Sequence, residues 1–427
     1  MSEWKTVRLG DVVSIKSGLS YKSEFLGKGD NLLLGMGCVS YKDRFVDSGA
    51  RPYYQDCDSK YLAVPGDLVL ATRQQSDNLP ILAMPAIIPE KYRGKKIIIG
   101  TNLYKVENGS DIDNRFLFLV LKGHDYVNYI RGVKTGTTVQ MVSKRNVEDF
   151  QFLCPPKETR ERIVSILSRY DALIENYQQQ TKLLEEAGQR LYKEWFVDFH
   201  FPGYESTIII DGVPERWEKK TLEDICSISK RVIQLSDIKE GRPYIGLEHM
   251  PRKDFCLSEW GNSEQINSSK YEYKESDILF GKIRPYFHKV GFAINDGYAS
   301  TDSIIMQSKP GMWALLLMTV SSEQFVNYTS QTCKEGAKMP RADWNQMKKY
   351  PVLIACDTIQ KKFERRCKLI ANEIKANALQ IHLLTEARDR LLPKLMSGEI
   401  CVEVAQSVTN GLGVRKEQTD SPQASDS

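Results

Sequence analysis

The sequence predicts a mixed α/β protein of the α+β class, in which two duplicated lobes are joined by two long helices. Three observations predict it: one helical stretch occurs twice, the openings of two segments repeat, and short apolar runs separated by turn residues fill both segments. The length of 427 residues agrees, because it exceeds what one hydrophobic core usually organises.

The repeated helix is the clearest sign of duplication. Residues 178–196 read QQQTKLLEEAGQRLYKEWF, and residues 378–396 read ALQIHLLTEARDRLLPKLM. Aligned without a gap, at an offset of 200 residues, the two stretches share Gln, Leu, Leu, Glu, Ala, Arg and Leu. The chain therefore contains one helical design twice.

The openings of the two lobes repeat as well. Residues 4–15 read WKTVRLGDVVSI and residues 217–228 read WEKKTLEDICSI, with Trp, Leu, Asp, Ser and Ile at the same spacing. Short apolar runs such as 68–70, 97–99 and 278–280 are bounded by Gly, Pro, Asn and Asp, which is typical of strands in a mixed α/β domain.

Both long helices carry apolar residues seven apart. The first has Ile163, Tyr170, Tyr177, Leu184 and Leu191; the second has Phe363, Ile370, Leu384 and Leu391, with Asn377 interrupting the series. This period predicts an antiparallel coiled coil about 60 Å long that relates the lobes by a pseudo-two-fold axis. Two unrelated amphipathic helices, each on its own lobe, are the alternative.

Prolines mark the helix ends. Pro155-Pro156 prevents an earlier start of the first helix, and Pro393 is expected to kink or end the second. The predicted organisation is lobe one at 1–156, a first helix at 157–197, a linker at 198–216, lobe two at 217–355, a second helix at 356–398 and a disordered tail at 399–427.

Composition excludes several classes of protein. With 41% hydrophobic and 27% charged residues and a net charge of +4, the chain is typical of a soluble globular protein, so we expect no membrane association and a cytoplasmic location. Nine cysteines form no C-x-x-C pair and the five histidines are scattered, so we expect reduced thiols and no metal site.

Two lobes on a rigid spacer suit duplex DNA, which presents equivalent grooves about 34 Å apart. Each lobe would read one half of a bipartite site, and the DNA beneath the spacer would remain unread. A non-DNA coiled-coil adaptor that clamps two protein partners has the same outline, and it remains the main alternative.

The order of these features resembles the DNA specificity subunit of type I restriction–modification systems. The resemblance rests on the paired openings, the linker GVPERW at 212–217, YIGLEHM at 244–250, SDILFGKIRPYFHKV at 276–290 and the two closing helices. It covers almost the whole chain, and it is the duplicated order, more than any one motif, that is specific.

The resemblance implies several partners. They are double-stranded DNA with a split site, two modification subunits that methylate adenine with S-adenosylmethionine, and two restriction subunits that use ATP and Mg²⁺ to translocate and cut. It also implies that this chain has no catalytic residues and binds no cofactor. The sequence agrees, because it lacks an Asn/Asp-Pro-Pro-Tyr/Phe motif, a glycine fingerprint and a phosphate loop, which makes a self-sufficient methyltransferase or nuclease improbable.

Two kinds of segment are predicted to contact DNA in each lobe: the residues that follow a central strand, and a loop containing glycine just before the long helix. Arg, Lys and Gln pair with base edges or phosphates, and glycines allow close approach of the backbone. The alternatives are solvated charges at a strand end and a surface loop that caps the lobe. The candidates are Arg73, Gln74, Gln75, Lys134, Thr137, Thr138 and Gln140 in lobe one, and Lys282, Arg284, Tyr286, His288, Lys289, Lys338 and Arg341 in lobe two.

Other conspicuous residues are expected to be structural. Gly66-Asp67 and Ser276-Asp277 fit turns ahead of buried strands, and Trp195 and Phe196 fit packing positions. The polar outer faces of the helices are expected to be solvated; the residues concerned include Arg160, Glu161, Arg162, Lys182, Glu185 and Arg190.

Overall fold

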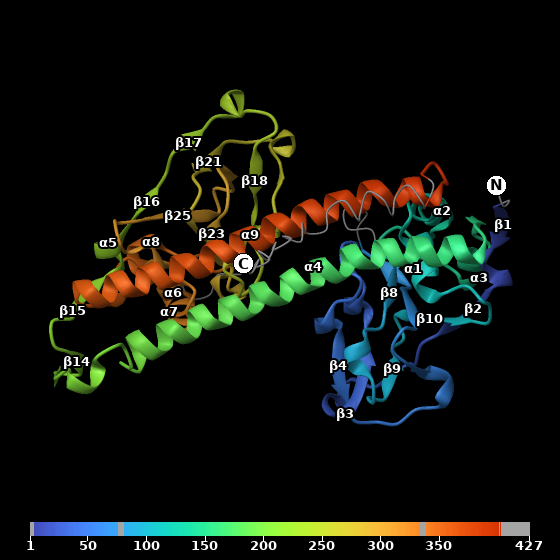
Figure 1. Cartoon of the computed structure of the whole chain (residues 1–427), viewed down its shortest axis with the longest axis horizontal. Helices are drawn as coiled ribbons and strands as arrows, with labels where there is room; N and C mark the ends of the chain where they lie inside the picture. The colour runs from blue at the N-terminus through green and yellow to red at the C-terminus, as the bar shows by residue number, and fades with distance from the viewer. Residues whose placement is uncertain (1–3, 76–80, 334–338, 401, 403–427) are drawn as a thin grey trace, which may run out of the picture. The chain divides into compact units, whose positions relative to one another are not determined.

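The computed structural model describes residues 4–75, 81–333, 339–400 and 402. They divide into two compact units. Unit one runs to Asp171 and resumes at Glu386, and unit two is Ala172–Thr385. Each unit therefore contains one predicted lobe and a segment of each long helix (Figure 1).

Lobe one is a mixed α/β domain with two four-stranded sheets. The first has the order β2-β10-β6-β8 and is antiparallel; the second has the order β4-β3-β9-β5 and pairs β3 with β9 in parallel. The strands are β2 (Val13–Ser17), β3 (Leu26–Leu34), β4 (Ala50–Tyr53), β5 (Leu62–Ala63), β6 (Leu68–Ala71), β8 (Pro85–Ile87), β9 (Ile97–Ile99) and β10 (Leu103–Asn108); the helices are α1 (Asn114–Lys122), α2 (His124–Val133) and α3 (Lys144–Glu148).

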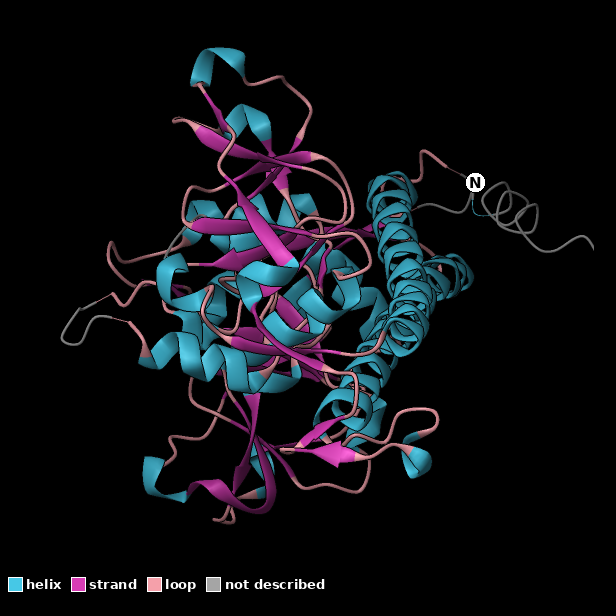
Figure 2. Ribbon diagram, turned by 90° about the vertical axis from the view of Figure 1, so that its left-hand side faces the viewer, coloured by secondary structure: helices cyan, strands magenta, loops and turns pink. Residues whose placement is uncertain are grey.

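Lobe two has two five-stranded sheets, with the orders β16-β25-β22-β23-β19 and β17-β21-β24-β18-β20. Its strands are β16 (Cys226–Ser229), β17 (Val232–Ile233), β18 (Pro243–Ile245), β19 (Cys256–Leu257), β20 (Gly261–Asn262), β21 (Lys270–Tyr273), β22 (Ile278–Gly281), β23 (Val290–Ala293), β24 (Gly297–Ala299) and β25 (Ser303–Ser308); its helices are α5 (Leu222–Ile225), α6 (Trp313–Val320), α7 (Glu323–Gln331) and α8 (Trp344–Met347). Strands (magenta) and helices (cyan) are both abundant in the structure (Figure 2). The mixed α/β character predicted for both lobes is confirmed.

The repeated openings have the same partner in both lobes. In lobe one β1 (Lys5–Arg8) pairs antiparallel with β12 (Gln151–Cys154), and in lobe two β15 (Glu218–Thr221) pairs antiparallel with β26 (Pro351–Ile354). Each pairing joins the start of a lobe to the strand that leads into a long helix. The duplication visible in the sequence is thus a duplication of topology.

The recurring Gly-Asp and Ser-Asp pairs form turns, as predicted. The carboxylate of Asp67 accepts a hydrogen bond from Val64 N at 3.0 Å, and that of Asp277 accepts one from Lys274 N at 2.9 Å. The preceding residues, Gly66 and Ser276, have φ of 90° and 71°. Both pairs turn the chain into the buried strands β6 and β22, so their recurrence reflects folding.

The long helices are α4 (Lys157–Tyr192), which continues as a π-helical turn at Lys193–Val197, and α9 (Asp357–Met396). The sequence predicts that Pro393 kinks or ends the second helix, and α9 ends at Met396, three residues beyond it. A proline in the last turn removes only the hydrogen bond to the carbonyl four residues earlier, so the helix survives there.

The two helices pack against each other inside each unit. In unit two the Phe363 ring, near the start of α9, lies 4.7 Å from Phe196 and 5.9 Å from Trp195, just beyond the end of α4. Trp195 and Phe196 are buried, which confirms their packing role. In unit one Arg388, near the end of α9, pairs with Asp171 of α4. In both units these contacts are those of an antiparallel pair, whereas the pseudo-two-fold relation of the lobes stays a prediction.

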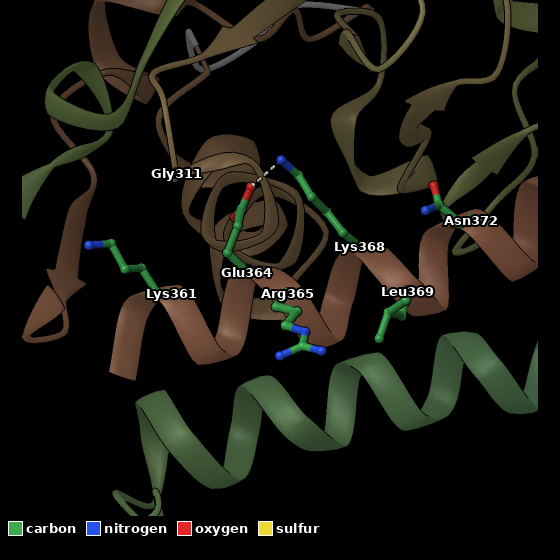
Figure 3. Close-up of a pocket in the computed structure, with 7 residues that line it drawn as sticks. All are labelled: Gly311, Lys361, Glu364, Arg365, Lys368, Leu369 and Asn372. Carbon is green, nitrogen blue, oxygen red and sulfur yellow. Dashed lines mark ion pairs between the residues drawn. The ribbon is translucent and has the colours of Figure 1, made fainter. Parts of the chain in front are cut away.

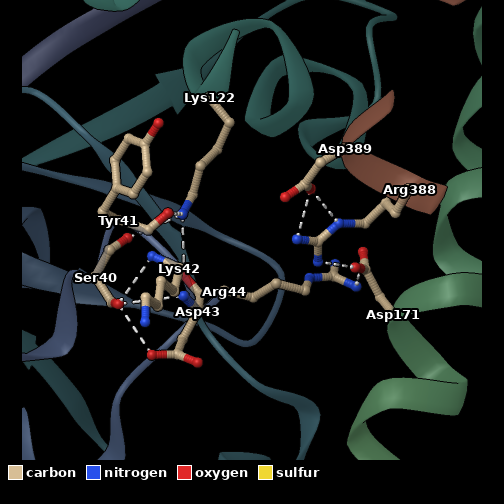
Figure 4. A network of polar contacts seen from close by, with 9 residues as sticks. All are labelled: Ser40, Tyr41, Lys42, Asp43, Arg44, Lys122, Asp171, Arg388 and Asp389. Atoms are coloured by element: carbon tan, nitrogen blue, oxygen red, sulfur yellow. Dashed lines mark hydrogen bonds and ion pairs between the residues drawn. The ribbon is translucent and has the colours of Figure 1, made fainter. Parts of the chain in front are cut away.

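In unit one, lobe one is attached to the helices by an ion-pair network (Figure 4). Arg44, in the loop after β3, pairs with Asp171 at 3.3 Å, and Asp171 also pairs with Arg388 at 2.9 Å. Behind this loop Lys122 donates hydrogen bonds to the carbonyls of Ser40 and Asp43, and burial lowers the pKa of Lys122 to about 8.

In unit two, buried carboxylates attach lobe two. Glu185 of α4 accepts a hydrogen bond from Phe255 N at 2.7 Å, and Glu364 of α9 accepts one from Ala314 N at 2.8 Å, at the start of α6. Burial raises the pKa of Glu185 to about 7. Gly188, one turn beyond Glu185, lets the side chain of Met318 approach α4.

These contacts correct one expectation for the outer faces. Glu185 is only 6% exposed, and the Arg160 side chain, 11% exposed, pairs with Asp111 at 2.7 Å. Neither side chain is simply solvated, because loops of the lobes pack against the helices at these positions.

Candidate nucleic-acid interface

The two candidate segments of lobe one form a single surface. β7 (Arg73–Gln74), just beyond β6, pairs antiparallel with β11 (Gln140–Met141), which ends the glycine loop. Gln140 lies opposite Gln74, and Met141 lies opposite Arg73. Segments that are some 66 residues apart in sequence therefore share one edge of the lobe.

Lobe two makes the same junction with different residues. Ile283 forms a β-bridge with Arg341, Arg284 N donates to Pro340 O at 2.8 Å, and Ala342 N donates to Lys282 O at 2.8 Å. The segment that follows β22 is thus joined to the loop ahead of α8, just as the segment after β6 is joined to the loop ahead of α3. The junction belongs to the duplicated design.

Gln74 organises the junction of lobe one from inside. Its side chain is 3% exposed; Nε2 donates to Gln140 Oε1 at 2.6 Å, and Oε1 accepts from Ile81 N and Leu82 N at 3.0 and 2.9 Å. These bonds fix the segment that carries its two neighbours. We therefore leave Gln74 out of the surface that we propose for DNA contact.

The neighbours of Gln74 are better placed to meet a ligand. Arg73 is half-buried, and its Nε makes no hydrogen bond to any residue that the structure describes. Gln75, Thr137 and Thr138 are exposed, and Lys134 is half-buried. Together they present a guanidinium, an amide, two hydroxyls and an ammonium, the groups that bind base edges and phosphates.

In lobe two the candidates follow a tight turn. Arg284 and His288 both have left-handed backbone conformations, with φ of 51° and 53°, on either side of Pro285–Phe287. His288 is 7% exposed and its Nε2 lies 2.8 Å from Ser321 O, so its ring holds the turn in place. The turn leaves Tyr286 54% exposed and Arg284 half-buried at the surface.

The lysines of this segment are engaged within the lobe. Lys282 donates to Thr301 O at 2.6 Å and lies 5.4 Å from the centre of the Tyr271 ring, and Lys289 donates to Leu247 O. Burial lowers the pKa of both lysines. Arg341 pairs with Asp302 at 3.1 Å, while Lys338 lies outside the described residues.

The structure adds Lys230, which the sequence analysis missed. Burial lowers the pKa of Lys282, attraction to Asp302 opposes this, and repulsion by Lys230 and Arg341 lowers the pKa further. The adjacent basic residues Lys230 and Arg231 were the available signal. Their position on the lobe depends on the pairing of β17 with β21, which local sequence does not reveal.

A separate cavity of about 380 Å³ lies along α9 in unit two (Figure 3). Lys361, Arg365 and Lys368 contribute to its lining, together with Glu364. The carboxylate of Glu364 is already held by Ala314 N and by Lys368, at 2.8 and 3.0 Å. We interpret this cavity as the seam where α9 meets lobe two.

The described ranges offer neither a metal site nor a membrane-spanning helix. In the described ranges, no cluster of three His, Cys, Asp or Glu residues could hold a metal ion, and the eight described cysteines are unpaired thiols. No helix in the same ranges has the length and apolar content that crossing a membrane requires.

Comparison with known proteins gives the surface a context. Residues 1–186 match the family model of the type I restriction modification DNA specificity domain. The chain is 26% identical over 310 residues to the type I restriction enzyme MjaIX specificity subunit of Methanocaldococcus jannaschii, covering 68% of this chain and 70% of that protein. It is 22% identical over 374 residues to the HindI specificity subunit of Haemophilus influenzae, covering 71% and 81%.

A solved structure shares the fold. The S subunit of a type I restriction-modification system from M. genitalium superposes with a TM-score of 0.54 at 13% identity, covering 92% of this chain and 96% of that one. Two mixed α/β lobes joined by helices are therefore the architecture of both chains.

Proposed function

We propose that this chain is the specificity subunit of a type I restriction–modification system and that each of its lobes binds one half of a split DNA site. The observation that carries the proposal is the duplicated junction: in both lobes a strand-end segment and a loop are hydrogen-bonded into one edge. Counted from the ends of β6 and β22, Arg73 corresponds to Ile283, and Arg284 lies one residue further along its edge. Each edge thus carries an arginine, the side chain that most often reads guanine.

The proposed contacts fall into two groups. Arg73, Gln75, Arg284 and Tyr286 flank the junction and suit contact with base edges in the major groove, where guanidinium and amide groups discriminate between base pairs. Phosphate contact suits the loop groups and cations, because they position a protein on DNA without reading sequence. The residues proposed for phosphate contact are Lys134, Thr137, Thr138, Lys230, Lys282 and Arg341.

The chemistry belongs to partners in this proposal. The chain would direct two modification subunits, which supply S-adenosylmethionine-dependent adenine methylation, and two restriction subunits, which supply ATP- and Mg²⁺-dependent translocation and cleavage. The chain itself would be non-catalytic and would bind neither cofactor. We place this assembly in the cytoplasm, where it would meet cellular DNA.

The test is to co-express the chain with candidate modification subunits and to map methylated adenines in the host DNA by single-molecule sequencing. We expect one split, asymmetric motif that is modified on both strands. Absence of modification from a complex that still forms would favour the adaptor.

Titration with duplex DNA provides an independent way to distinguish a DNA-binding subunit from an adaptor that binds proteins. Neutralising phosphates releases counterions, so a DNA-binding lobe must lose affinity steeply as salt rises, whereas a lobe that binds protein need not. An affinity for duplex DNA that is absent at every salt concentration would contradict the proposal.

A further inference from the structure

The attachment of lobe one depends on one carboxylate, that of Asp171 on α4. Its Oδ2 lies 3.3 Å from Arg44 Nη1, in the loop of lobe one, and its Oδ1 lies 2.9 Å from Arg388 Nη1, on α9 (Figure 4). The Asp171 side chain is 10% exposed. A single buried group therefore links the lobe to both long helices, and we name this trio the Asp171 bridge.

The loop that carries Arg44 is held rigidly on its other side. Ser40 Oγ accepts hydrogen bonds from the backbone N–H groups of Lys42 and Asp43, both at 3.1 Å. Lys122 donates to the carbonyls of Ser40, Tyr41 and Asp43, and the Arg44 guanidinium lies 5.6 Å from the centre of the Phe118 ring. Because the loop cannot yield easily, displacement of the lobe must break the Asp171 bridge.

The bridge is absent from the repeated design. At the offset of 200 residues, Asp171 corresponds to Ala371 and Arg388 corresponds to Gly188. In unit two Ala371 is buried in the core, and Gly188 faces Met318 and Phe255 of lobe two, so neither equivalent position carries a charge. The bridge therefore has a role specific to lobe one.

We propose that Asp171 is a positioning residue that fixes lobe one on the long helices and thereby sets the spacing between half-sites that the protein accepts. This inference rests on the proposed function. One extra base pair between half-sites moves the second half-site by about 3.4 Å and rotates it by about 35°. A contact made at 3.3 Å is broken by such a displacement. Binding to a site with the wrong spacing would therefore break the Asp171 bridge.

The experiment uses the full chain with its modification subunits and three duplex probes: the mapped site, and the same site with its spacer one base pair shorter or longer. The readout is the ratio of the methylation rate on the native spacer to the rate on the altered spacers. We expect Asp171→Asn to lower this ratio about tenfold, in line with loss of one partner of a desolvated charge pair. The preference for bases within each half-site should be unchanged.

Two further variants complete the experiment. Arg44→Gln removes only the lobe side of the bridge and should lower the same ratio, which keeps the test available if Asp171→Asn folds poorly. Glu386→Gln is the matched control, because Glu386 lies two residues from Arg388 on α9 and, among the described residues, its carboxylate pairs with Arg390 alone. It should leave the ratio as in the wild type.

An unchanged ratio in both bridge variants, with folding intact, would overturn the proposal. So would altered base preference within a half-site at unchanged spacing selectivity, because that would give Asp171 a part in base reading. A wild-type complex that methylates no split site would contradict the proposed function instead, and the two failures are therefore distinguishable.

Discussion

The two lobes share a topology but are fastened to their helices by different chemistry. Lobe one uses a charged bridge, Arg44–Asp171–Arg388, of which Arg44 is 34% exposed. Lobe two uses the buried carboxylates of Glu185 and Glu364, each of which accepts a backbone N–H. Duplication copied the sheets and helices, whereas the contacts between lobe and helix diverged.

The divergence shows where such a protein has freedom to vary. Helix pairing depends on apolar positions that repeat, such as Leu184 and Leu384, whereas lobe attachment depends on single polar positions beside them. An ion pair tolerates solvent at its edge, whereas the buried Glu185 carboxyl is destabilised when it loses its proton. The attachments of lobe one and lobe two should therefore respond differently to pH, salt and substitution.

The largest expected difference concerns pH at lobe two. Burial raises the pKa of Glu185 to about 7, and of nearby Asp254 as well. Between the unfolded pKa near 4.5 and the folded pKa, the folded state holds a proton that the unfolded state has released. The free energy of unfolding therefore falls as pH rises through this window, by up to about 3 kcal/mol.

Glu185→Gln isolates this effect. The amide is neutral at every pH and still accepts from Phe255 N, so we expect it to match the wild type near pH 5 and to exceed it at pH 8. Urea unfolding across this pH range measures the difference. A constant difference between the two proteins would contradict a buried, titrating Glu185.

The next largest effect concerns the Asp171 bridge. Asp171→Ala leaves two neighbouring guanidiniums without their shared carboxylate, so we expect the free energy of unfolding to fall by about 2 kcal/mol, less than for a fully buried pair. Urea denaturation provides the measurement. Glu386→Ala, which removes an exposed pair on the same helix, should cost no more than about 0.5 kcal/mol, and equal losses would contradict the distinction.

At the proposed DNA surface the lobes should act separately. Arg73→Ala and Arg284→Ala should each weaken binding to the mapped site by about 1–3 kcal/mol and relax base preference in one half-site only. Fluorescence anisotropy with probes altered in one half-site at a time gives the measurement. Loss of preference in both half-sites from either variant would show that the lobes do not read independently.

The smallest effect concerns salt. Raising NaCl to 1 M should shrink the stability difference between the wild type and Asp171→Ala by a few tenths of a kcal/mol, because ions screen the partly exposed Arg44. The difference between the wild type and Glu185→Ala should hardly change, since a buried hydrogen bond is not screened. If salt changed the stability losses of Asp171→Ala and Glu185→Ala equally, the proposed difference between a screened and an unscreened attachment would be wrong.

The architecture could be predicted from the sequence because the duplication is visible as similar short patterns at two places in the chain. The matched openings, the apolar heptads and the Pro155-Pro156 start all concern residues close together in the chain, and α4 does begin at Lys157. Pro393 indicates the end of α9 only to within three residues, because a proline in the last turn removes a single helical hydrogen bond. The prediction that Arg160 and Glu185 are solvated was wrong, because helical periodicity identifies the apolar face of a helix but not where a distant loop packs on it.

The candidate site was harder to predict for the same reason. Sequence identified the strand-end segments and the glycine loops but gave no sign that β7 pairs with β11, or that Ile283 pairs with Arg341. It also could not separate Arg73 from Gln74, because only the pairing turns one toward the surface and buries the other. Which of these side chains contact DNA stays a prediction.

Exchange of one lobe tests whether each lobe reads its own half-site. Residues 1–156 would be replaced by the corresponding lobe of a specificity subunit with a different known target, and methylated adenines would be mapped in cells that contain the modification subunits. We expect one half of the split motif to change to that of the donor while the other half and the spacer persist. A change in both halves at once would contradict a protein whose two lobes each read one half-site.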